Sequence, residues 1–147
     1  PKNAFDKAIT HSRRVAMSLS DLFCVERHKA HFFELVKNQL DIIFANEQEI
    51  TSLINAKSFN DVVLFSKGIK KNVIITRGEK GAISINSNEI IECNAQSNLK
   101  IKDLTGAGDL FAAGYLHGLI NNLSIKESLL KGTELSSKII QKIGARI

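Results

Sequence analysis

Apolar and polar positions follow two patterns along this chain, one typical of strands and one typical of helices, and segments with the two patterns alternate. Continuous apolar runs, typical of strands buried on both faces of a parallel sheet, occur in DIIFA (41–45) and NVIITRG (72–78). An alternating apolar and polar pattern predicts a further strand at 14–19. Apolar residues at helical spacing predict helices at 3–12, 28–39, 46–54 and 59–68, the last of them closed by Gly68.

The second half of the chain continues this alternation. Residues 81–92 show two alternating strands around Asn86-Ser87-Asn88, which predicts a hairpin. The stretch DLTGAGDLFAAGYLHGL (103–119) opens a long apolar helix that reaches about residue 121, and residues 123–143 supply one or two more helices. We therefore expect an α/β fold of three layers, a mostly parallel sheet with helices on both faces. In such a fold, ligands lie at the carboxyl ends of strands, near helix N-termini.

Composition narrows the class of protein. The chain has 147 residues, 44% hydrophobic and 24% charged, as is typical of one soluble globular domain. Its net charge of +5 comes from scattered lysines, so we expect no nucleic-acid partner, although a mild positive field suits an anionic substrate such as a nucleotide. No apolar run is long enough to span a membrane and no signal-peptide pattern stands at the start. Together with two distant cysteines, Cys24 and Cys93, this predicts a cytoplasmic protein.

The first residues suggest that the chain is incomplete. It begins at Pro1 and enters a helical pattern at once, with no preceding strand or cap. We expect it to be a piece of a longer protein, or a processed one.

The strongest candidate chemistry lies in Gly106-Ala107-Gly108-Asp109, at the start of the long apolar helix. Glycines let a ligand approach the backbone, and the N–H groups and dipole of a helix N-terminus attract phosphate. No GxxxxGK[ST] occurs, and GxGxxG would need glycine where Phe111 stands, so two common phosphate loops are excluded. An aspartate there can accept the proton of a hydroxyl that attacks phosphate. Alternatively, the glycines make a tight turn and Asp109 complements the dipole, and GxGD alone favours this simpler reading.

Two further motifs follow predicted strands. Asn46 and Glu49 have the spacing of a capping box, which is the simpler explanation, but an acidic turn after a strand can also hold a hydrated magnesium ion. Thr76, Gly78 and Gly81 form TxGxxG after the strand at 72–78. This motif suits either a hairpin connection or a loop opened for the phosphates of a nucleotide.

In combination, these motifs resemble the ribokinase-type (PfkB family) carbohydrate and nucleoside kinases. The family signature DTxGAGD is matched by DLTGAGD (103–109), except that Leu104 replaces the usual threonine. The family motifs NxxE and TxGxxG match the residues at 46–49 and 76–81, in the family's order. The resemblance covers residues 1–147 as the C-terminal half of such a kinase, with the ATP site and catalytic loop but without the β lid. The stretch 19–28 also resembles bacterial adenosine and sugar kinases.

The resemblance implies a role for each matched residue. Asp109 would be the catalytic base, and the amides of Gly106, Ala107 and Gly108 would form the anion hole. Asn46 and Glu49 would organise Mg²⁺, and Thr76, Gly78 and Gly81 would line the ATP site, with an adenine pocket near the 94–102 loop and the helix from about Lys131. Asp103 would contribute to a cofactor or monovalent-cation (K⁺) site.

The resemblance predicts transfer of the ATP γ-phosphoryl group to a hydroxyl of a small sugar or nucleoside, with adenosine or a related ribofuranoside favoured and fructose or another sugar possible. A homodimer of the full-length protein is also expected. Two alternatives stay open. The chain can be a nucleotide-binding fragment that catalyses nothing without its sugar-binding half, or a flavodoxin-like regulatory domain in which GAGD is only a turn.

Overall fold

A computed structural model describes residue 7 and residues 9–146. The helix expected at 3–12 lies largely outside these residues, although positions 9–11 are helical. The chain divides into two compact units, one comprising Pro1–Ile74 with Asn86–Asn88 and the other comprising Ile75–Ile85 with Glu89–Ile147. Each unit is described by itself.

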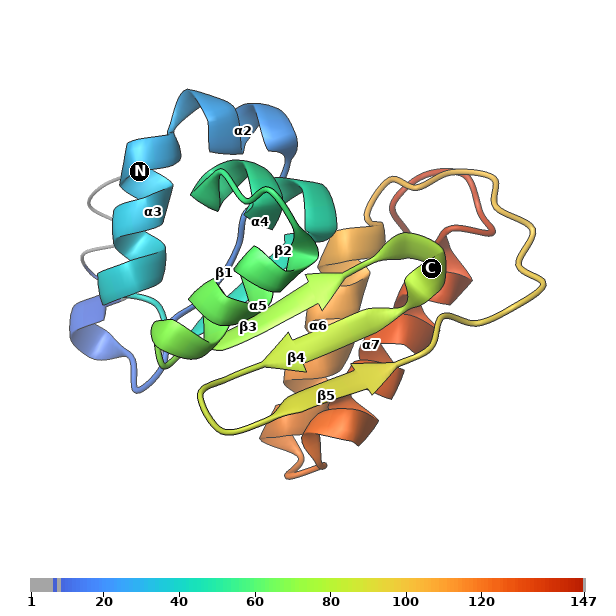
Figure 1. The fold of residues 1–147 in the computed structure, drawn as a ribbon. Helices are drawn as coiled ribbons and strands as arrows, with labels where there is room; N and C mark the ends of the chain where they lie inside the picture. Colours follow the sequence, from blue (N-terminus) through green and yellow to red (C-terminus); the bar gives the residue numbers. More distant parts are fainter. Residues whose placement is uncertain (1–6, 8, 147) are drawn as a thin grey trace. The chain divides into compact units, whose positions relative to one another are not determined.

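In the first unit a pair of helices separates successive strands, whereas in the second unit a hairpin is followed by two helices (Figure 1). The first unit contains β1 (Ala16–Ser18), α2 (Leu22–Arg27), α3 (Lys29–Asn38), β2 (Ile42–Asn46), α4 (Glu47–Ile54), α5 (Phe59–Gly68) and the start of β3 (Asn72–Thr76). The second unit continues with the 3₁₀ turn η1 (Gly78–Lys80), β4 (Ala82–Ile85), β5 (Ile90–Cys93), α6 (Ala107–Ile120) and α7 (Ile125–Ile139).

The sheet is mixed, with strand order β1-β2-β3-β4-β5. Strands β1 and β2 are parallel, with Ala16 opposite Ile42, whereas β4 and β5 are antiparallel, with Ala82 opposite Cys93. The central residues of β3 and the first four residues of β2 are buried, as their continuous apolar runs predicted. All of β4 is buried too, although its sequence predicted an alternating pattern. The predicted α/β fold is confirmed, and so is the hairpin at 81–92, which supplies the antiparallel pair.

Some boundaries differ from the sequence prediction. Helix α2 was not expected, because six residues are too few to show an apolar period; it begins instead at a cap, where Asp21 Oδ1 accepts the N–H of Cys24 at 2.8 Å. The strand predicted for 14–19 is limited to Ala16–Ser18. The strand predicted for 72–78 ends at Thr76, where the chain enters η1.

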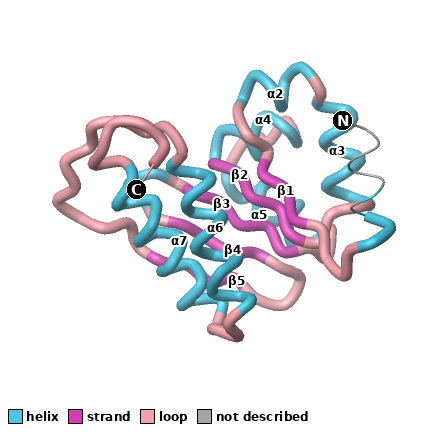
Figure 2. Tube along the Cα trace, turned by 180° about the vertical axis from the view of Figure 1, so that it is seen from behind, coloured by secondary structure: helices cyan, strands magenta, loops and turns pink. Residues whose placement is uncertain are grey.

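Helices α6 and α7 pack closely in the second unit and run side by side in Figures 1 and 2. Small residues bring the two backbones together. A Cβ on Gly114 would lie 2.6 Å from the carbonyl oxygen of Lys131, and one on Gly118 would lie 2.5 Å from Oγ of Ser128. Helix α7 also packs against β4 and β5. The start of α6 is therefore carried by a helix that is held tightly along its length.

This packing predicts that Gly114→Ala destabilises the chain, by about 1–3 kcal/mol, because the added methyl group meets backbone atoms that cannot move aside. Urea unfolding measures the change. Gly68→Ala is the matched control: Gly68 also lies in a helix, but its surroundings are open, so alanine should raise the free energy of unfolding by up to about 1 kcal/mol. Equal effects of the two substitutions would contradict close packing at Gly114.

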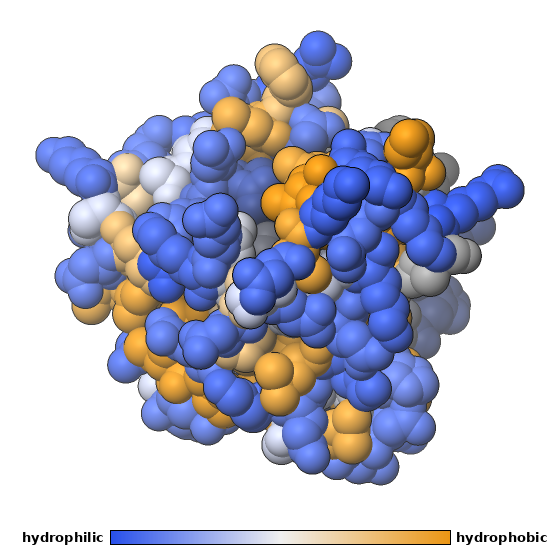
Figure 3. Space-filling model, turned by 90° about the vertical axis from the view of Figure 1, so that its right-hand side faces the viewer, coloured by the Kyte–Doolittle hydropathy of each residue, from blue (hydrophilic) through white to orange (hydrophobic). Residues whose placement is uncertain are grey.

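The surface combines hydrophilic and apolar side chains, as the composition suggests. Figure 3 shows hydrophilic side chains over most of one face, with apolar side chains in separate patches among them. Among the described residues, no helix has both the length and the apolar character needed to cross a bilayer.

Candidate functional site

Helix α6 begins differently from α4, α5 and α7, and like α3 it has no side-chain cap. Helices α4, α5 and α7 each begin with a capping box, in which a side chain occupies an N–H group of the first turn. Helix α6 begins at Gly106, which has φ 79° and no side chain to cap the helix. The first N–H groups of a helix have no intrahelical partner. The start of α6 therefore offers backbone donors that the other three helices use internally.

The left-handed backbone of Gly106 requires glycine, and its surroundings require it too. A Cβ at this position would lie 3.0 Å from Cβ of Ala145. The next amide, that of Ala107, donates to the carbonyl oxygen of Leu104 at 3.1 Å. Of the three amides predicted to form an anion hole, that of Ala107 is thus engaged within the loop.

Gly108 has no such structural reason to be glycine. It is exposed in the first turn of α6, its φ is not positive, and no heavy atom outside its own helix backbone lies within 4 Å of where a Cβ would be. Glycine in a helix costs about 1 kcal/mol relative to alanine. Packing therefore does not explain this residue, whereas a ligand that approaches the amide directly does.

Asp109 follows in the same turn and is exposed. Within the described part of the chain, no hydrogen bond or ion pair engages its carboxylate. The carboxylate is thus available to an incoming group, and the adjacent N–H groups and the helix dipole favour an anion. A free carboxylate beside an uncapped helix start can accept the proton of a hydroxyl that attacks a phosphoryl group bound at the amides.

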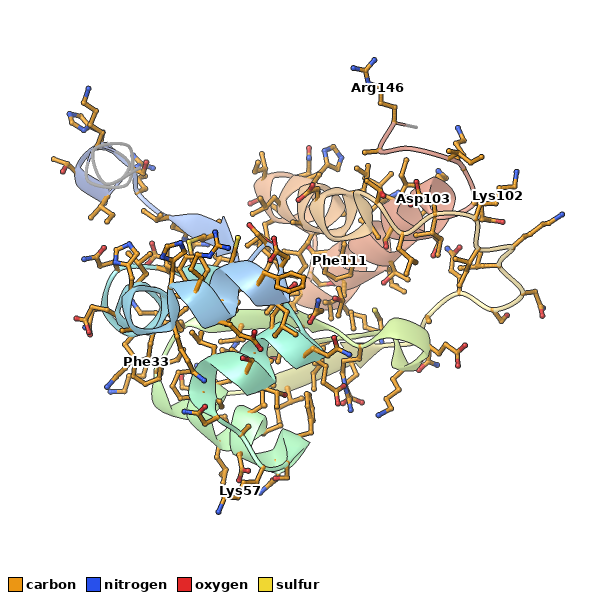
Figure 4. All side chains as sticks on the ribbon, turned by 90° about the horizontal axis from the view of Figure 1, so that it is seen from above. Phe33, Lys57, Lys102, Asp103, Phe111 and Arg146 are labelled. Carbon is orange, nitrogen blue, oxygen red and sulfur yellow. The ribbon has the colours of Figure 1, made fainter. Side chains whose placement is uncertain are left out.

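Asp103, in contrast, is fully engaged by the protein. Its Oδ1 accepts the N–H and the hydroxyl of Thr105, at 2.9 and 2.7 Å, and its Oδ2 accepts the N–H of Gly144 at 2.9 Å. Hydrogen bonds from the amide of Thr105, then from Gly144, lower the pKa of this carboxyl below its usual value of 3.8. Figure 4 shows Lys102 and Asp103 together on the loop before α6.

The TxGxxG segment forms a tight connection from β3 to β4. The N–H of Arg77 donates to the carbonyl oxygen of Gly81 at 2.8 Å, and the N–H of Gly81 donates to that of Gly78 at 3.0 Å. Both glycines have positive φ, 57° and 85°, and a Cβ on Gly81 would lie 2.0 Å from the carbonyl oxygen of Cys93. The connection accounts for both glycines, and Thr76 is the last residue of β3. Nucleotide binding by Thr76, Gly78 and Gly81 stays a prediction.

Asn46 and Glu49 form the capping box of α4 in the first unit, at the carboxyl end of β2. The Asn46 N–H and side-chain amide donate to the two Glu49 carboxylate oxygens at 2.9 and 2.7 Å, and Asn46 Oδ1 accepts the Glu49 N–H at 2.8 Å. Glu49 is 5% exposed. Burial raises the pKa of its carboxyl above the usual 4.5, partly offset by the Asn46 hydrogen bond.

The capping box limits how Mg²⁺ could bind at Asn46 and Glu49. Each Glu49 oxygen already accepts one hydrogen bond and keeps a second lone pair, which suits a water ligand of the ion better than the ion itself. Among the described residues, no three His, Cys, Asp or Glu side chains are placed to hold a metal together. A water-mediated site at Asn46 and Glu49 fits the lone pairs that the capping box leaves open.

The buried carboxyl predicts a pH effect on stability. Because the pKa of Glu49 is raised in the folded state, its contribution to folding is greatest below pH 4.5 and is lost as the pH rises through the raised value. Glu49→Gln removes the titrating group, so it should remove the fall of the urea midpoint that the wild type shows as the pH rises through the raised pKa.

Glu127 provides the matched control, because it occupies the same capping-box position in α7 but has a lowered pKa, held down by hydrogen bonds from Ser124. Glu127→Gln should lower the midpoint near neutral pH. The wild-type slope of the midpoint against pH should therefore change in opposite directions in the two variants, and the same direction in both would contradict the role of burial.

A separate hollow of about 430 Å³ lies in the first unit among α3, α4 and α5, where Phe33 and Lys57 contribute to its lining (Figure 4). None of the site residues predicted from sequence lines it. In the second unit, Asp103 contacts Thr105 at the start of α6 and Gly144 beyond α7, and the turn at Gly81 packs against residues 93–95. The contact of Asp103 with Gly144 was not predicted, because Gly144 signalled only the end of a helix.

The fold and the start of α6 allow the chain to be compared with known proteins. Residues 7–147 match the family described as pfkB family carbohydrate kinase. The chain belongs to the pfkB carbohydrate kinase family. The family's members are sugar and nucleoside kinases, so the fold and the family that the motifs suggested are confirmed, and membership of this family implies the use of ATP.

Several pfkB relatives are similar over most of the chain. The adenosine kinase of Sinorhizobium meliloti is 34% identical with a TM-score of 0.94, over 99% of this chain and 46% of that one. A probable sugar kinase of Rhizobium etli CFN 42 is 34% identical with a TM-score of 0.90, over 98% of this chain and 44% of that one. A Lactococcus lactis ribokinase is 32% identical, over 73% of this chain and 34% of its own length. The chain thus spans less than half the length of these relatives.

Proposed function

We propose that the protein containing this chain transfers the γ-phosphoryl group of ATP to a hydroxyl of a small sugar or nucleoside. The observation that carries the proposal is that Gly108 and Asp109 stand next to each other. Packing does not explain the glycine at 108, and the carboxylate of Asp109 is exposed and engaged by no described residue. Membership of the pfkB family supports the reaction class.

In this mechanism, Asp109 accepts the proton of the acceptor hydroxyl as its oxygen forms a bond to the γ-phosphorus. The bond between that phosphorus and the oxygen bridging to the β-phosphate breaks, and ADP leaves with the bridging oxygen. The amides of Gly106 and Gly108, joined by that of Ala107 if its bond to Leu104 opens, stabilise the charge on the phosphoryl oxygens. Positioning matters more than basicity in such a loose transition state.

The remaining predicted residues would serve ATP. Thr76, Gly78 and Gly81 would line the nucleotide site, and Asn46 with Glu49 would orient water around the bound cation. Mg²⁺, when bound, supplies charge neutralisation on the β- and γ-phosphates. Glu49→Gln should then raise the Mg²⁺ concentration needed for half-maximal rate, and an unchanged titration would assign Glu49 to the helix cap alone.

We favour adenosine or a related ribofuranoside as the acceptor, with fructose or another sugar as the next choice. Similarity to an adenosine kinase, a probable sugar kinase and a ribokinase supports this range. We also propose a cytoplasmic enzyme that forms a homodimer, with a monovalent cation such as K⁺ near Asp103.

The test is a coupled assay of ADP release by the complete protein, with adenosine, ribose, fructose and 2-keto-3-deoxygluconate as acceptors. Acceptor-dependent release with one of them is expected, with adenosine or ribose giving the highest kcat/KM. The alternative is a nucleotide-binding protein without activity. ATP binding in isothermal titration, with no ADP release on any acceptor, would favour that alternative.

A further inference from the structure

One carboxylate in the second unit joins the start of α6 to the chain beyond α7. Asp103 holds Thr105 through Oδ1 and the N–H of Gly144 through Oδ2, across 41 positions of sequence. All three hydrogen bonds are 2.9 Å or shorter. Hydrogen bonds to a charged acceptor are stronger than those between neutral groups, so this carboxylate is a firm connection between the two segments.

Backbone contacts reinforce the same connection. The N–H groups of Lys102 and Asp103 both donate to the carbonyl oxygen of Ile140, at 2.7 and 3.2 Å. Gly106 approaches Ala145 so closely that a Cβ would lie 3.0 Å from the Ala145 side chain. The segment 140–145, which we call the C-terminal turn, thus contacts the loop at residues 102, 103 and 106, immediately before the proposed anion-binding amides.

Within the loop itself, a backbone hydrogen bond from the N–H of Ala107 to the carbonyl oxygen of Leu104 closes the turn, but no side chain caps the helix that follows. Helix α6 lacks a side-chain cap, Gly106 is in a left-handed conformation that is accessible to glycine without strain, and Thr105 is exposed. A glycine backbone has more accessible conformations than that of other residues, so fixing it costs more conformational entropy. A glycine-rich loop that must hold its amides at a fixed position therefore needs support from other parts of the chain. The Asp103 carboxylate and the C-terminal turn supply that support.

We propose that Asp103 is a positioning residue, which holds the loop at Thr105–Asp109 against the C-terminal turn in the geometry that phosphoryl transfer requires. The proposal rests on the proposed function for its effect on rate. The C-terminal turn, which contains none of the residues matched to a motif, then belongs to the machinery of the reaction. Asp103 touches neither the phosphoryl group nor the acceptor in this role, and acts through the amides and through Asp109.

A first experiment tests the connection without reference to activity. In Asp103→Asn, the side chain gains N–H donors where it must accept, so it cannot satisfy both Thr105 and Gly144. Amide hydrogen exchange of the complete protein should become at least about tenfold faster at Thr105 and Gly144, equivalent to about 1.4 kcal/mol of lost protection. Glu127→Gln, which weakens the cap at the other end of α7, should leave these amides unchanged. Unchanged exchange in Asp103→Asn would overturn the proposal.

A second experiment tests positioning through a split between kcat and KM. Asp103→Asn should lower kcat about tenfold or more while the KM for ATP changes less than about threefold, because the loop is displaced rather than the nucleotide site removed. Glu127→Gln should keep the wild-type kcat. A rise in KM alone, or equal losses in both variants, would show a merely structural role and would overturn the proposal.

Gly144→Ala completes the test by changing the other partner. A Cβ at Gly144 meets nothing within 4 Å, but its φ of 84° is strained for alanine, so the substitution moves the turn without a clash. If the two residues act as one connection, Gly144→Ala also lowers kcat, and the double variant is close to the single ones. Fully multiplicative losses would contradict the connection. If the complete protein shows no kinase activity at all, the proposed function fails, whereas the exchange experiment still decides whether Asp103 holds the loop.

Discussion

Asp109→Asn is expected to lower the kcat of the complete protein by about 10²–10⁴-fold, the usual contribution of a general base. The amide has the shape of the carboxylate but cannot accept the hydroxyl proton. The dissociation constant for ATP should be nearly unchanged, because the proposed mechanism assigns the phosphate contacts to the backbone amides. The stability should fall by less than about 1 kcal/mol, since only the attraction of Asp109 to the helix dipole is lost.

Asp61→Asn is the matched control for this substitution. Asp61 is also an aspartate in the first turn of a helix, but in α5, where it accepts the N–H groups of Lys57 and Ser58 at 2.9 Å. Its substitution should cost stability and leave kcat unchanged. Steady-state rates and urea unfolding of both variants give the comparison. Wild-type turnover in Asp109→Asn would remove Asp109 from the mechanism and leave it as a residue that complements the helix dipole.

Gly108→Ala should have opposite effects on stability and on activity. The methyl group enters open space, so the free energy of unfolding should rise by up to about 1 kcal/mol through better helix propensity. The same methyl group covers the amide that the phosphoryl oxygens approach, so kcat/KM should fall by about 10²-fold or more, the scale of losing one oxyanion-hole donor. The larger Gly108→Val should abolish Mg²⁺-dependent ATP binding in isothermal titration.

Gly68→Ala separates these two effects, because Gly68 shares the open surroundings but lies in α5. It should stabilise the chain without changing turnover. A Gly108→Ala variant that is more stable and fully active would mean that no ligand approaches this amide. The anion site would then have to lie elsewhere, and GAGD would be a turn, as the flavodoxin-like alternative has it.

Much of the fold was predictable because it depends on local patterns. The buried strand β3 and the hairpin β4–β5 follow from apolar periodicity, and the start of α4 follows from its cap at Asn46. The short helix α2 was missed because its six residues carry no periodic apolar face. Its one local signal was the cap at Asp21, three residues before Cys24.

The site was predictable only in part. The motifs named the residues, and their order indicated the family, which the comparison then confirmed. The same motifs treated all glycines alike. In the structure, Gly81 and Gly106 are required by positive φ and by close neighbours, whereas Gly108 is required by neither. The distinction depends on which atoms surround each Cα, and a single sequence does not contain that information.

The sequence by itself determined the α/β class, the order of the three motifs, and the position of a glycine-rich turn at the start of a long apolar helix. These properties follow from periodicity, caps and spacing within a few residues, so they can be derived without knowledge of the fold. Only the tertiary structure decided that Asp103 binds Gly144, and that Gly108 stands open beside the unengaged Asp109. The first depends on two segments that are distant in sequence and meet only in the folded chain, and the second depends on which atoms surround Gly108 and Asp109, so neither can be derived from the sequence alone.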